Sequence, residues 1–181
     1  MNNANSWGHE TGLSRVYEIN VSRGGVPKTH VPQAQFMSDG VEGDRQSNPR
    51  IHGGRDRAVC LFSLEVIEAL QAEGHPIVPG SSGESLTITG LDWAGIKPGD
   101  LLRVGAGVLL EITSYTAPCE VIRESFLNGD YKRISHKQFP GWSRVYARVL
   151  VEGRDGAIRR SGHRRIPPLC KGRQRGIEGL K

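Results

Sequence analysis

The sequence predicts a mainly β protein with some α-helix, built as a small β-barrel with one or two flanking helices. Short alternating or apolar segments typical of strands recur along the chain, mostly separated by hairpin-like turns. Only one long segment, from Ser63 to Ala72, has confident helical spacing. The chain also contains 24 glycines and 10 prolines, which suit many strands joined by tight turns.

The first half of the chain gives two strands and the helix. Alternation predicts a strand over 13–21 and a second over 31–37. Ser63 is a good N-cap for the helix, Gly74 ends it, and Pro76 follows. A small-residue loop then leads to a strand over 86–88.

In the second half, strands are expected over 101–104 and 108–113, joined by a hairpin turn at 105–107. A helix is expected to begin around Cys119 and to run toward Phe126. The alternation within 141–151 predicts the closing strand. We therefore divide the chain into a disordered leader (1–12), a barrel domain (13–152) and a basic tail (153–181) with room for one edge strand that uses Ile158, Ile166 and Leu169 before disorder.

The basic charge is concentrated at the end of the chain. From Arg154 onward there are nine Lys or Arg and two acidic residues, a net charge of +7 against +5 for the whole chain, so the rest carries −2. Such a tail could contact nucleic acid, or it could be a solvated terminus; we favour the second because no aromatic residue is interleaved.

Composition also limits the location and the kind of metal site. No apolar run reaches the roughly 20 residues that span a bilayer, and the first residues lack a signal core, so we expect a cytoplasmic protein without membrane contact. Cys60, Cys119 and Cys170 are too far apart for a disulfide framework or a closed zinc site.

The residue that organises the chain is Cys119. It follows Pro118 at the expected junction of a strand and a helix. The first turn of a helix lowers the pKa of a thiol and favours the thiolate, which binds soft metals or attacks electrophiles. The alternative is a small packing residue in a corner of the fold.

Two glycine-rich basic segments are candidate anion sites. The turn 23–28 combines two glycines with Arg23 and Lys28, and it suits an anion seat or an ordinary hairpin equally well. The segment 52–60 places His52, Gly53, Arg55 and Arg57 close together, and arginine binds phosphate and carboxylate in a bidentate manner. Asp56 could instead pair with a neighbouring arginine.

The order of these segments resembles the MOSC domain, named for the C-terminal region of molybdenum cofactor sulfurase. The resemblance covers about residues 13–152, and within the family the chain looks most like bacterial stand-alone proteins of the hydroxylaminopurine-resistance type. The matching motifs are Gly24–Lys28, Gly43–Arg45, His52–Cys60, Gly83–Thr87, Pro98–Asp100, Pro118–Cys119 and Gly141–Trp142 leading to Tyr146.

The resemblance implies the MOSC β-barrel and a pyranopterin molybdenum cofactor. It makes Cys119 a molybdenum ligand or a persulfide carrier, and a thiolate suits a thiophilic metal. It assigns cofactor-binding roles to Lys28, His52, Gly53, Arg55, Arg57, Glu84 and Arg144. Arg144 could equally be a solvated residue on the barrel exterior. The family usually has asparagine where this chain has Ser85, which puts a cofactor contact at Ser85 in doubt.

Three functions follow as expectations. The first is an oxidoreductase that reduces N-hydroxylated small molecules at a molybdenum centre held by Cys119, with an external electron donor protein because the chain has no flavin or iron–sulfur motif. The second is a sulfur carrier that uses a Cys119 persulfide from a sulfur donor for metal–sulfur cofactor assembly. The third is a non-catalytic binding module that uses the basic tail. His75, His136 and His163 are interpreted as surface or packing residues.

Overall fold

The computed structural model describes residues 14–45, 53–105 and 107–156. The predicted leader, His52 and the tail beyond Gly156, including the suggested edge strand, lie outside these residues. The strands are β1 (Arg15–Val21), β2 (Thr29–Val31), β3 (Gln33–Met37), β4 (Gly40–Val41), β5 (Val59–Ser63), β6 (Leu86–Thr89), β7 (Leu101–Val104), β8 (Val108–Tyr115), β9 (Val145–Val151) and β10 (Gly153–Gly156). The predicted strands are therefore all present, and the expected strand over 31–37 is two strands, β2 and β3.

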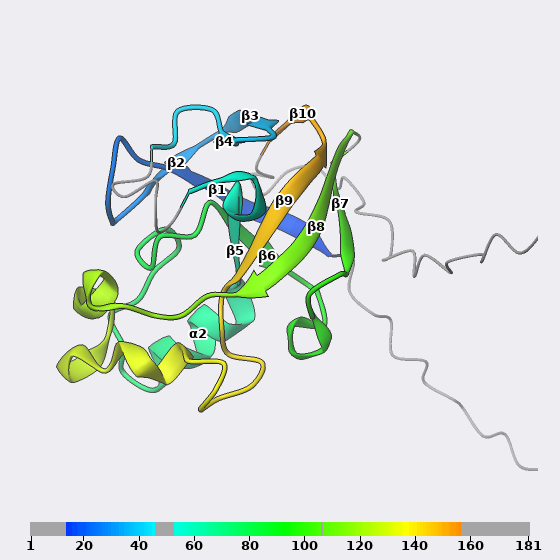
Figure 1. Ribbon diagram of the computed structural model, residues 1–181. Coiled ribbons are helices and arrows are strands. Elements are labelled where there is room, and N and C mark those ends of the chain that lie inside the picture. Colours follow the sequence, from blue (N-terminus) through cyan, green and yellow to red (C-terminus); the bar gives the residue numbers. More distant parts are fainter. Residues whose placement is uncertain (1–13, 46–52, 106, 157–181) are drawn as a thin grey trace, which may run out of the picture.

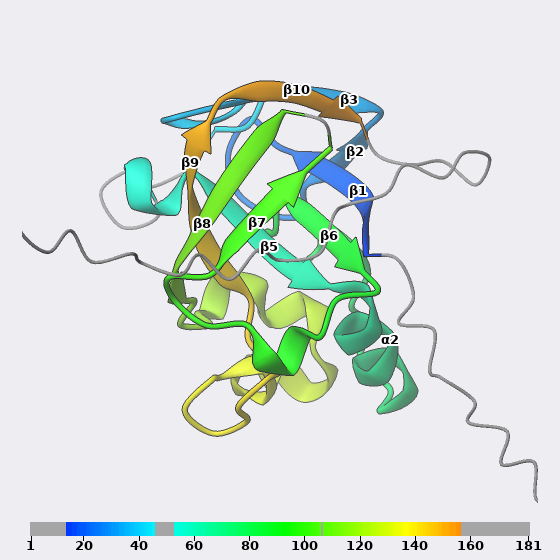
Figure 2. The same ribbon diagram turned by 90° about the vertical axis from the view of Figure 1, so that its right-hand side faces the viewer.

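Seven strands form one curved sheet in the order β2-β1-β6-β5-β9-β8-β7 (Figures 1 and 2). Neighbouring strands are antiparallel except β5 and β6, which are parallel. A parallel pair needs a long crossover, and here the crossover contains the helix α2 (Leu64–Ala72). Hairpin order holds for β1–β2, β3–β4 and β7–β8, whereas β1–β6, β5–β6, β5–β9 and β3–β10 pair strands that do not follow one another as hairpins.

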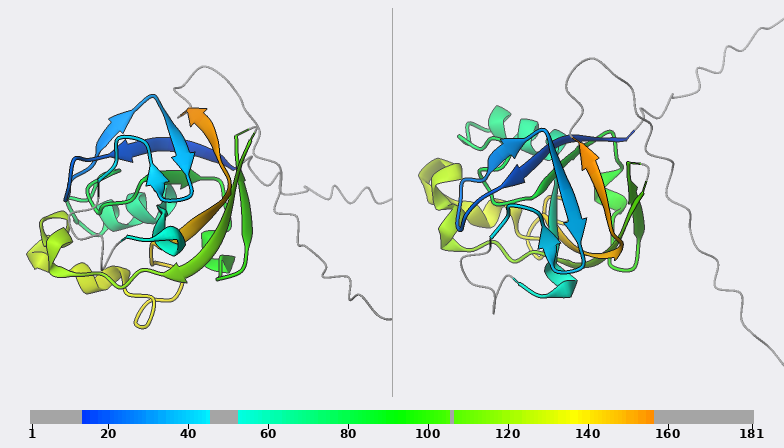
Figure 3. Two further views of the ribbon diagram at one scale, coloured as in Figure 1. Left: turned by 45° about the horizontal axis from the view of Figure 1, so that its top comes forward. Right: turned by 90° about the horizontal axis from the view of Figure 1, so that it is seen from above.

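A second sheet, in the order β10-β3-β4, lies across the end of the molecule opposite α2 (Figures 1 and 3). Its buried Phe36 and Val41 join the same hydrophobic core as the larger sheet. Because β10 pairs with β3 and not with an edge of the larger sheet, neither sheet closes on itself within the described residues. The mainly β fold is confirmed, whereas the closed barrel is not shown.

The helix α2 forms as predicted. The Ser63 hydroxyl accepts a hydrogen bond from the Val66 N–H at 3.3 Å, and Gly74 has a φ of 91° just beyond the helix. Ile67 and Leu70 form its buried face. No helix of the described residues is long and apolar enough to cross a membrane.

The helix expected after Cys119 is replaced by three short 3₁₀ helices, η3 (Glu120–Ser125), η4 (Leu127–Gly129) and η5 (Tyr131–Ile134). Asn128 has a φ of 55°, which no α-helix accommodates, and it interrupts the run. Two further 3₁₀ turns are η1 (Arg55–Arg57) and η2 (Trp93–Gly95). The apolar spacing was too short to specify an α-helix.

Candidate functional site

Five side chains form a continuous row across one face of the large sheet; we call Asn20, Ser85, Cys60, Tyr146 and Ser114 the polar row. Residues paired across strands share a face. The ladders pair Cys60 with Tyr146, and Tyr146 with Ser114. Asn20 donates its N–H to the Ser85 carbonyl at 2.8 Å, and Ser85 donates to the Cys60 carbonyl at 2.7 Å. The first three are buried, and Tyr146 and Ser114 are half-buried, so the row runs from the interior toward the surface.

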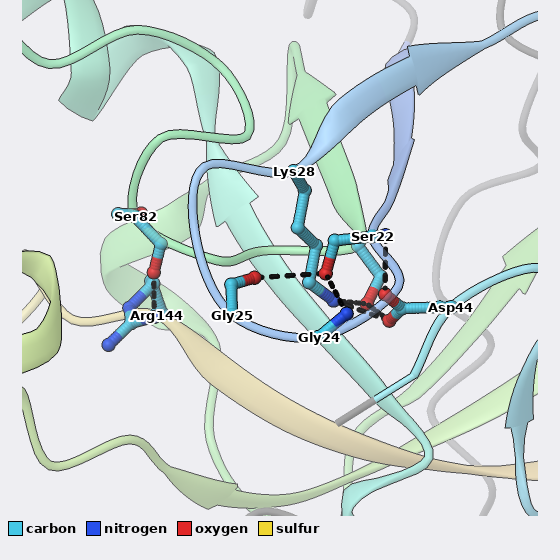
Figure 4. Close-up of polar contacts among 8 residues, drawn as sticks. Ser22, Gly24, Gly25, Lys28, Asp44, Ser82 and Arg144 are labelled. Carbon is cyan, nitrogen blue, oxygen red and sulfur yellow. Dashed lines mark hydrogen bonds and ion pairs between the residues drawn. The ribbon is translucent and has the colours of Figure 1, made fainter. Parts of the chain in front are cut away.

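Lys28 reaches this row from the turn between β1 and β2 (Figure 4). Its Nζ donates to the Ser85 Oγ at 3.0 Å and pairs with the Asp44 Oδ2 at 2.5 Å. The other Asp44 oxygen accepts the Ser22 N–H at 2.9 Å. Asp44 therefore compensates the Lys28 charge and fixes the glycine turn. The hydroxyl of Ser85 takes a polar role here that does not require the family's asparagine.

Arg144 is buried, with 7% of its surface exposed. This finding overturns the alternative of a solvated residue on the exterior. Its Nη1 donates to the Ser82 carbonyl (Figure 4), whereas its Nε is buried without a partner. Within the described residues the guanidinium has no carboxylate at ion-pair distance. A buried charge with unmet donors is costly, so this cation is suited to receive an anion.

Glu84 supports the loop that holds Arg144. It is fully buried. Its Oε1 accepts the Gly80 N–H at 2.6 Å, and its Oε2 accepts the Ser82 hydroxyl at 2.7 Å. Burial raises the pKa of Glu84, and these hydrogen bonds and the Arg144 charge oppose the rise. The structure thus places Glu84 beneath the site, with both oxygens bonded inside its own loop.

Tyr146 lies at the centre of the charges around the site. Burial raises the pKa of Tyr146 to about 12; Cys60 and Cys119 add to the rise, and Arg144 and Arg57 oppose it. The phenol therefore keeps its proton near neutral pH. Burial likewise raises the pKa of the Cys60 thiol against the charges of Arg144 and Lys28.

Cys119 stands beside this cluster and outside the apolar interior. It is the half-buried residue before η3, and its carbonyl accepts the Ile122 N–H at 3.2 Å. It is near enough to Tyr146 to contribute to the raised pKa of that phenol. In Figure 1 the turn 22–28 and η3 lie on the same side of the molecule. Cys119 is thus reachable from solvent next to the polar row.

The predicted turn 53–57 is held over β8 and β9 but is exposed. The Thr113 hydroxyl lies 2.5 Å from the Asp56 carbonyl oxygen and 3.1 Å from that of Tyr146. The Arg57 guanidinium lies 5.7 Å from the centre of the Tyr146 ring. Arg55 is exposed and makes no hydrogen bond or ion pair to another described residue. Gly53 is half-buried just before η1.

The structure thus brings four predicted residues together around the polar row: Lys28, Arg57, Cys119 and Arg144. Sequence reasoning missed the roles of Asp44, Cys60 and Tyr146 in the cluster. All three lie in quoted motifs, but nothing in the sequence showed that β5 pairs with β9. A cavity of about 570 Å³ borders Asp44 and is lined by Arg23, Met37 and residues 39–45. In the described parts of the chain, no three His, Cys, Asp or Glu side chains form a metal cluster.

Comparison with known families settles the assignment. A family model for the MOSC domain matches residues 48–161, more than half of the chain. The chain belongs to the MOSC domain family. The resemblance seen in the motifs is therefore confirmed.

Two relatives of this MOSC protein are bacterial. It is 31% identical over 132 residues to the uncharacterized protein YflK of Bacillus subtilis, covering 72% of this chain and 58% of YflK. It is 30% identical over 91 residues to protein YiiM of Escherichia coli, covering 48% of this chain and 40% of YiiM. The chain thus spans about half the length of these relatives.

A fungal relative and two solved structures complete the comparison. A protein named reductase from Gibberella moniliformis is 29% identical over 140 residues, 74% of this chain and 21% of that protein. Crystal structures of YiiM from Geobacillus stearothermophilus and from Escherichia coli superpose with TM-scores of 0.64 and 0.58, at 24% and 23% identity. They cover 80% and 79% of this chain, and 71% and 66% of the respective YiiM chains. At that identity these structures show a shared fold.

Proposed function

We propose that this MOSC protein binds a pyranopterin molybdenum cofactor and reduces N-hydroxylated small molecules, with Cys119 as the protein ligand of the metal. The observation that carries the proposal is the placement of a reachable thiol and a buried, carboxylate-free guanidinium around Tyr146. A thiolate is the soft donor that molybdenum prefers, and the guanidinium suits the anionic end of a pterin phosphate. The residues present therefore fit the group.

The predicted residues contribute to cofactor binding to different degrees in this proposal. Arg144 is the main anion-binding residue. Lys28, whose charge Asp44 already balances, contributes a hydrogen bond more than a free charge. The exposed turn 53–57 covers the outer side of the cofactor, and His52 belongs to the same motif. Glu84 acts indirectly by shaping the loop that carries Ser82.

The metal centre, when bound, would supply the two-electron chemistry, with an external donor protein supplying the electrons. The protein binds the group at Cys119 and Arg144 and limits water through the half-buried site. Burial raises the pKa of the Tyr146 phenol to about 12, so the phenol keeps its proton throughout the neutral range and would be available as a hydrogen-bond donor to a bound group.

Metal content tests the binding step. The protein would be purified from cells able and unable to make the cofactor, and its molybdenum content measured. Cys119→Ser should lose the metal, whereas Cys170→Ser, the same exchange in the tail, should keep it. Equal, negligible metal in protein from both cell types would overturn the proposal.

A second experiment tests the anion-binding role of Arg144. Arg144→Gln should lower the retained pterin more than Arg148→Gln, because Arg148 already pairs with Asp56 at 3.2 Å. Thermal unfolding of both variants shows whether the fold is intact. Equal retention by the two variants would remove Arg144 from the site.

A sulfur-transfer function is the second candidate, and the half-buried position of Cys119 favours it. The Cys119 thiolate would attack the outer sulfur of a persulfide on a cysteine desulfurase, forming a new S–S bond and releasing the desulfurase thiolate. Mass spectrometry after incubation with a desulfurase and cysteine should show one added sulfur on Cys119. An unmodified Cys119 peptide would exclude this function.

A further inference from the structure

The segment that follows Cys119 depends on a few contacts for its position. Residues 120–134 form only short 3₁₀ turns, and most of their side chains are exposed. Val121 and Leu127 are 61% and 48% exposed. Ile122, Phe126 and Ile134 are buried in the hydrophobic core, so the exposed chain around Leu127 is the part that opens most easily unless specific contacts hold it.

The end of α2 provides two such contacts. The Nδ1 of His75 accepts the Leu127 N–H at 2.9 Å, and the Phe126 ring packs edge-on against the imidazole at 5.4 Å between centroids. Arg133 donates two hydrogen bonds, at 2.8 and 2.6 Å, to Glu73. The His75 side chain is 8% exposed, so of the two expected roles, surface or packing, it has the second.

The same segment also touches the loop that holds Arg144. The Ser125 hydroxyl donates to the Ser81 carbonyl at 2.9 Å, and the next residue, Ser82, accepts the Arg144 guanidinium. A shift of residues 120–134 would therefore disturb both Cys119 and the seat of Arg144.

The contact at His75 requires a neutral ring. A nitrogen accepts a hydrogen bond only while it carries no proton, and a proton on Nδ1 would face the Leu127 N–H. The other ring nitrogen lies 3.6 Å from the Glu73 Oε2. The charged groups around His75 are thus Glu73, at the end of α2, and Arg133 of η5, which shares the same carboxylate.

We propose that His75 is a positioning residue for the Cys119 segment and holds it through Leu127 only while its imidazole is neutral. Histidine changes charge between about pH 5 and pH 8. Mild acid would therefore break this hydrogen bond and loosen the chain at Leu127 while the sheet stays folded. The inference concerns this contact alone and holds whatever Cys119 binds.

Hydrogen exchange tests it without any cofactor. Exchange of the Leu127 amide would be followed at about pH 8 and about pH 5.5, each rate being divided by the rate of an unstructured chain at the same pH. Loss of one hydrogen bond should lower the protection roughly threefold to tenfold at the lower pH. Amides of β5 serve as the internal reference and should keep their protection.

Two variants separate this role from general stability. His75→Gln keeps an acceptor without a titrating proton and should remove the pH dependence. His136→Gln makes the same change in the ring stacked on Tyr115 and should leave it intact. Equal wild-type protection at both pH values, or the same pH dependence in His75→Gln, would overturn the proposal.

Discussion

Glu84 is a carboxyl group without access to water, and its hydrogen-bond donors come from its own loop and from Thr87. Burial raises its pKa above the ordinary value of 4.5, so the folded chain holds this proton more tightly than the unfolded chain does. The resulting stabilisation is full below pH 4.5 and is lost as the pH rises through the folded-state pKa.

Glu84→Gln should remove this pH dependence, because the amide keeps the shape without titrating. In urea unfolding, the advantage of the wild type over the variant should shrink as the pH rises from about 4.5 toward neutrality. Glu84→Ala should cost about 2 to 3 kcal/mol, since it leaves the Gly80 and Ser82 donors buried without an acceptor. A difference that does not change with pH would mean that Glu84 is ionised throughout.

For single residues, the sequence indicated which side chains could bind a ligand, but it did not indicate their burial or their partners. The sequence singled out Lys28, Cys119 and Arg144 by their side-chain chemistry, and their binding roles stay predictions. It did not show that Asp44 balances Lys28 or that Arg144 is buried. Both facts depend on loops that meet only in the folded chain, such as the approach of the turn 22–28 to the loop 80–84.

Among the elements, the loop 78–85 is shaped by its glycines. Gly80 has a φ of +80°, and a Cβ there would lie 2.5 Å from the Lys28 carbonyl oxygen. Gly99 has a similar φ of +92°, but a Cβ there would have no atom within 4 Å. The two positions therefore share a backbone conformation and differ only in the room available for a Cβ.

Alanine at these two glycines measures the loop contact. Gly99→Ala should pay only for the left-handed backbone, about 1 kcal/mol. Gly80→Ala should cost roughly 1 to 3 kcal/mol more, because backbone must move to relieve the overlap. Urea unfolding compares the two. Equal losses would show that the turn 22–28 adjusts freely to the loop.

The Thr113 hydroxyl helps to hold the turn η1 through its contact with the Asp56 carbonyl oxygen. Thr113→Val should cost about 1 kcal/mol and should speed hydrogen exchange at Arg57, whose N–H is bonded to the Gly54 carbonyl at 2.9 Å. Thr89→Val is the matched control, since that hydroxyl donates to Glu65 at 2.7 Å. Faster exchange at Arg57 in both variants would indicate a general loss of stability.

Strands were easier to predict than the segment after Cys119. Alternation specified β1 and β9 because their pattern is long enough to define a face, and an apolar, β-branched run specified β8. Residues 120–134 instead take their shape from Glu73, His75 and Ser81, which are distant in sequence. Local spacing could not anticipate those partners, so the expected α-helix was wrong.

For the whole molecule, the second sheet closes one end of the core through β10. Its register pairs Gly153 with Phe36 and Gly156 with Gln33. A chain that ends after Gly156 keeps this ladder, whereas one that ends after Glu152 leaves one edge of β3 unpaired, with β4 still bonded on the other side.

The shorter chain should therefore be less stable by about 2 to 4 kcal/mol, as expected for several lost ladder hydrogen bonds, and more prone to associate through the open edge of β3. Urea unfolding and sedimentation of the two chains provide the test. If both unfold at the same urea concentration, β10 contributes nothing to the core.

Overall architecture was predictable only as a class. The strand count and the helix indicated a mainly β domain, but the parallel β5–β6 pair and the separate sheet of β10 depend on pairings between distant segments. Those pairings decide whether a sheet closes, which is why the barrel expected from the sequence is not what the strand order shows.

The crossover helix α2 also sets a constraint on how the chain can change. It begins four residues after Cys60, a member of the polar row, and it ends just before His75, which holds the Cys119 segment through Leu127. One inserted residue would rotate its far end by about 100° and turn His75 away from Leu127. Even four inserted residues, which nearly restore the angle, would carry it about 6 Å along the axis. The length of α2 thus fixes the distance between Cys60 and the His75–Leu127 contact, and relatives that have this contact should have a helix of the same length.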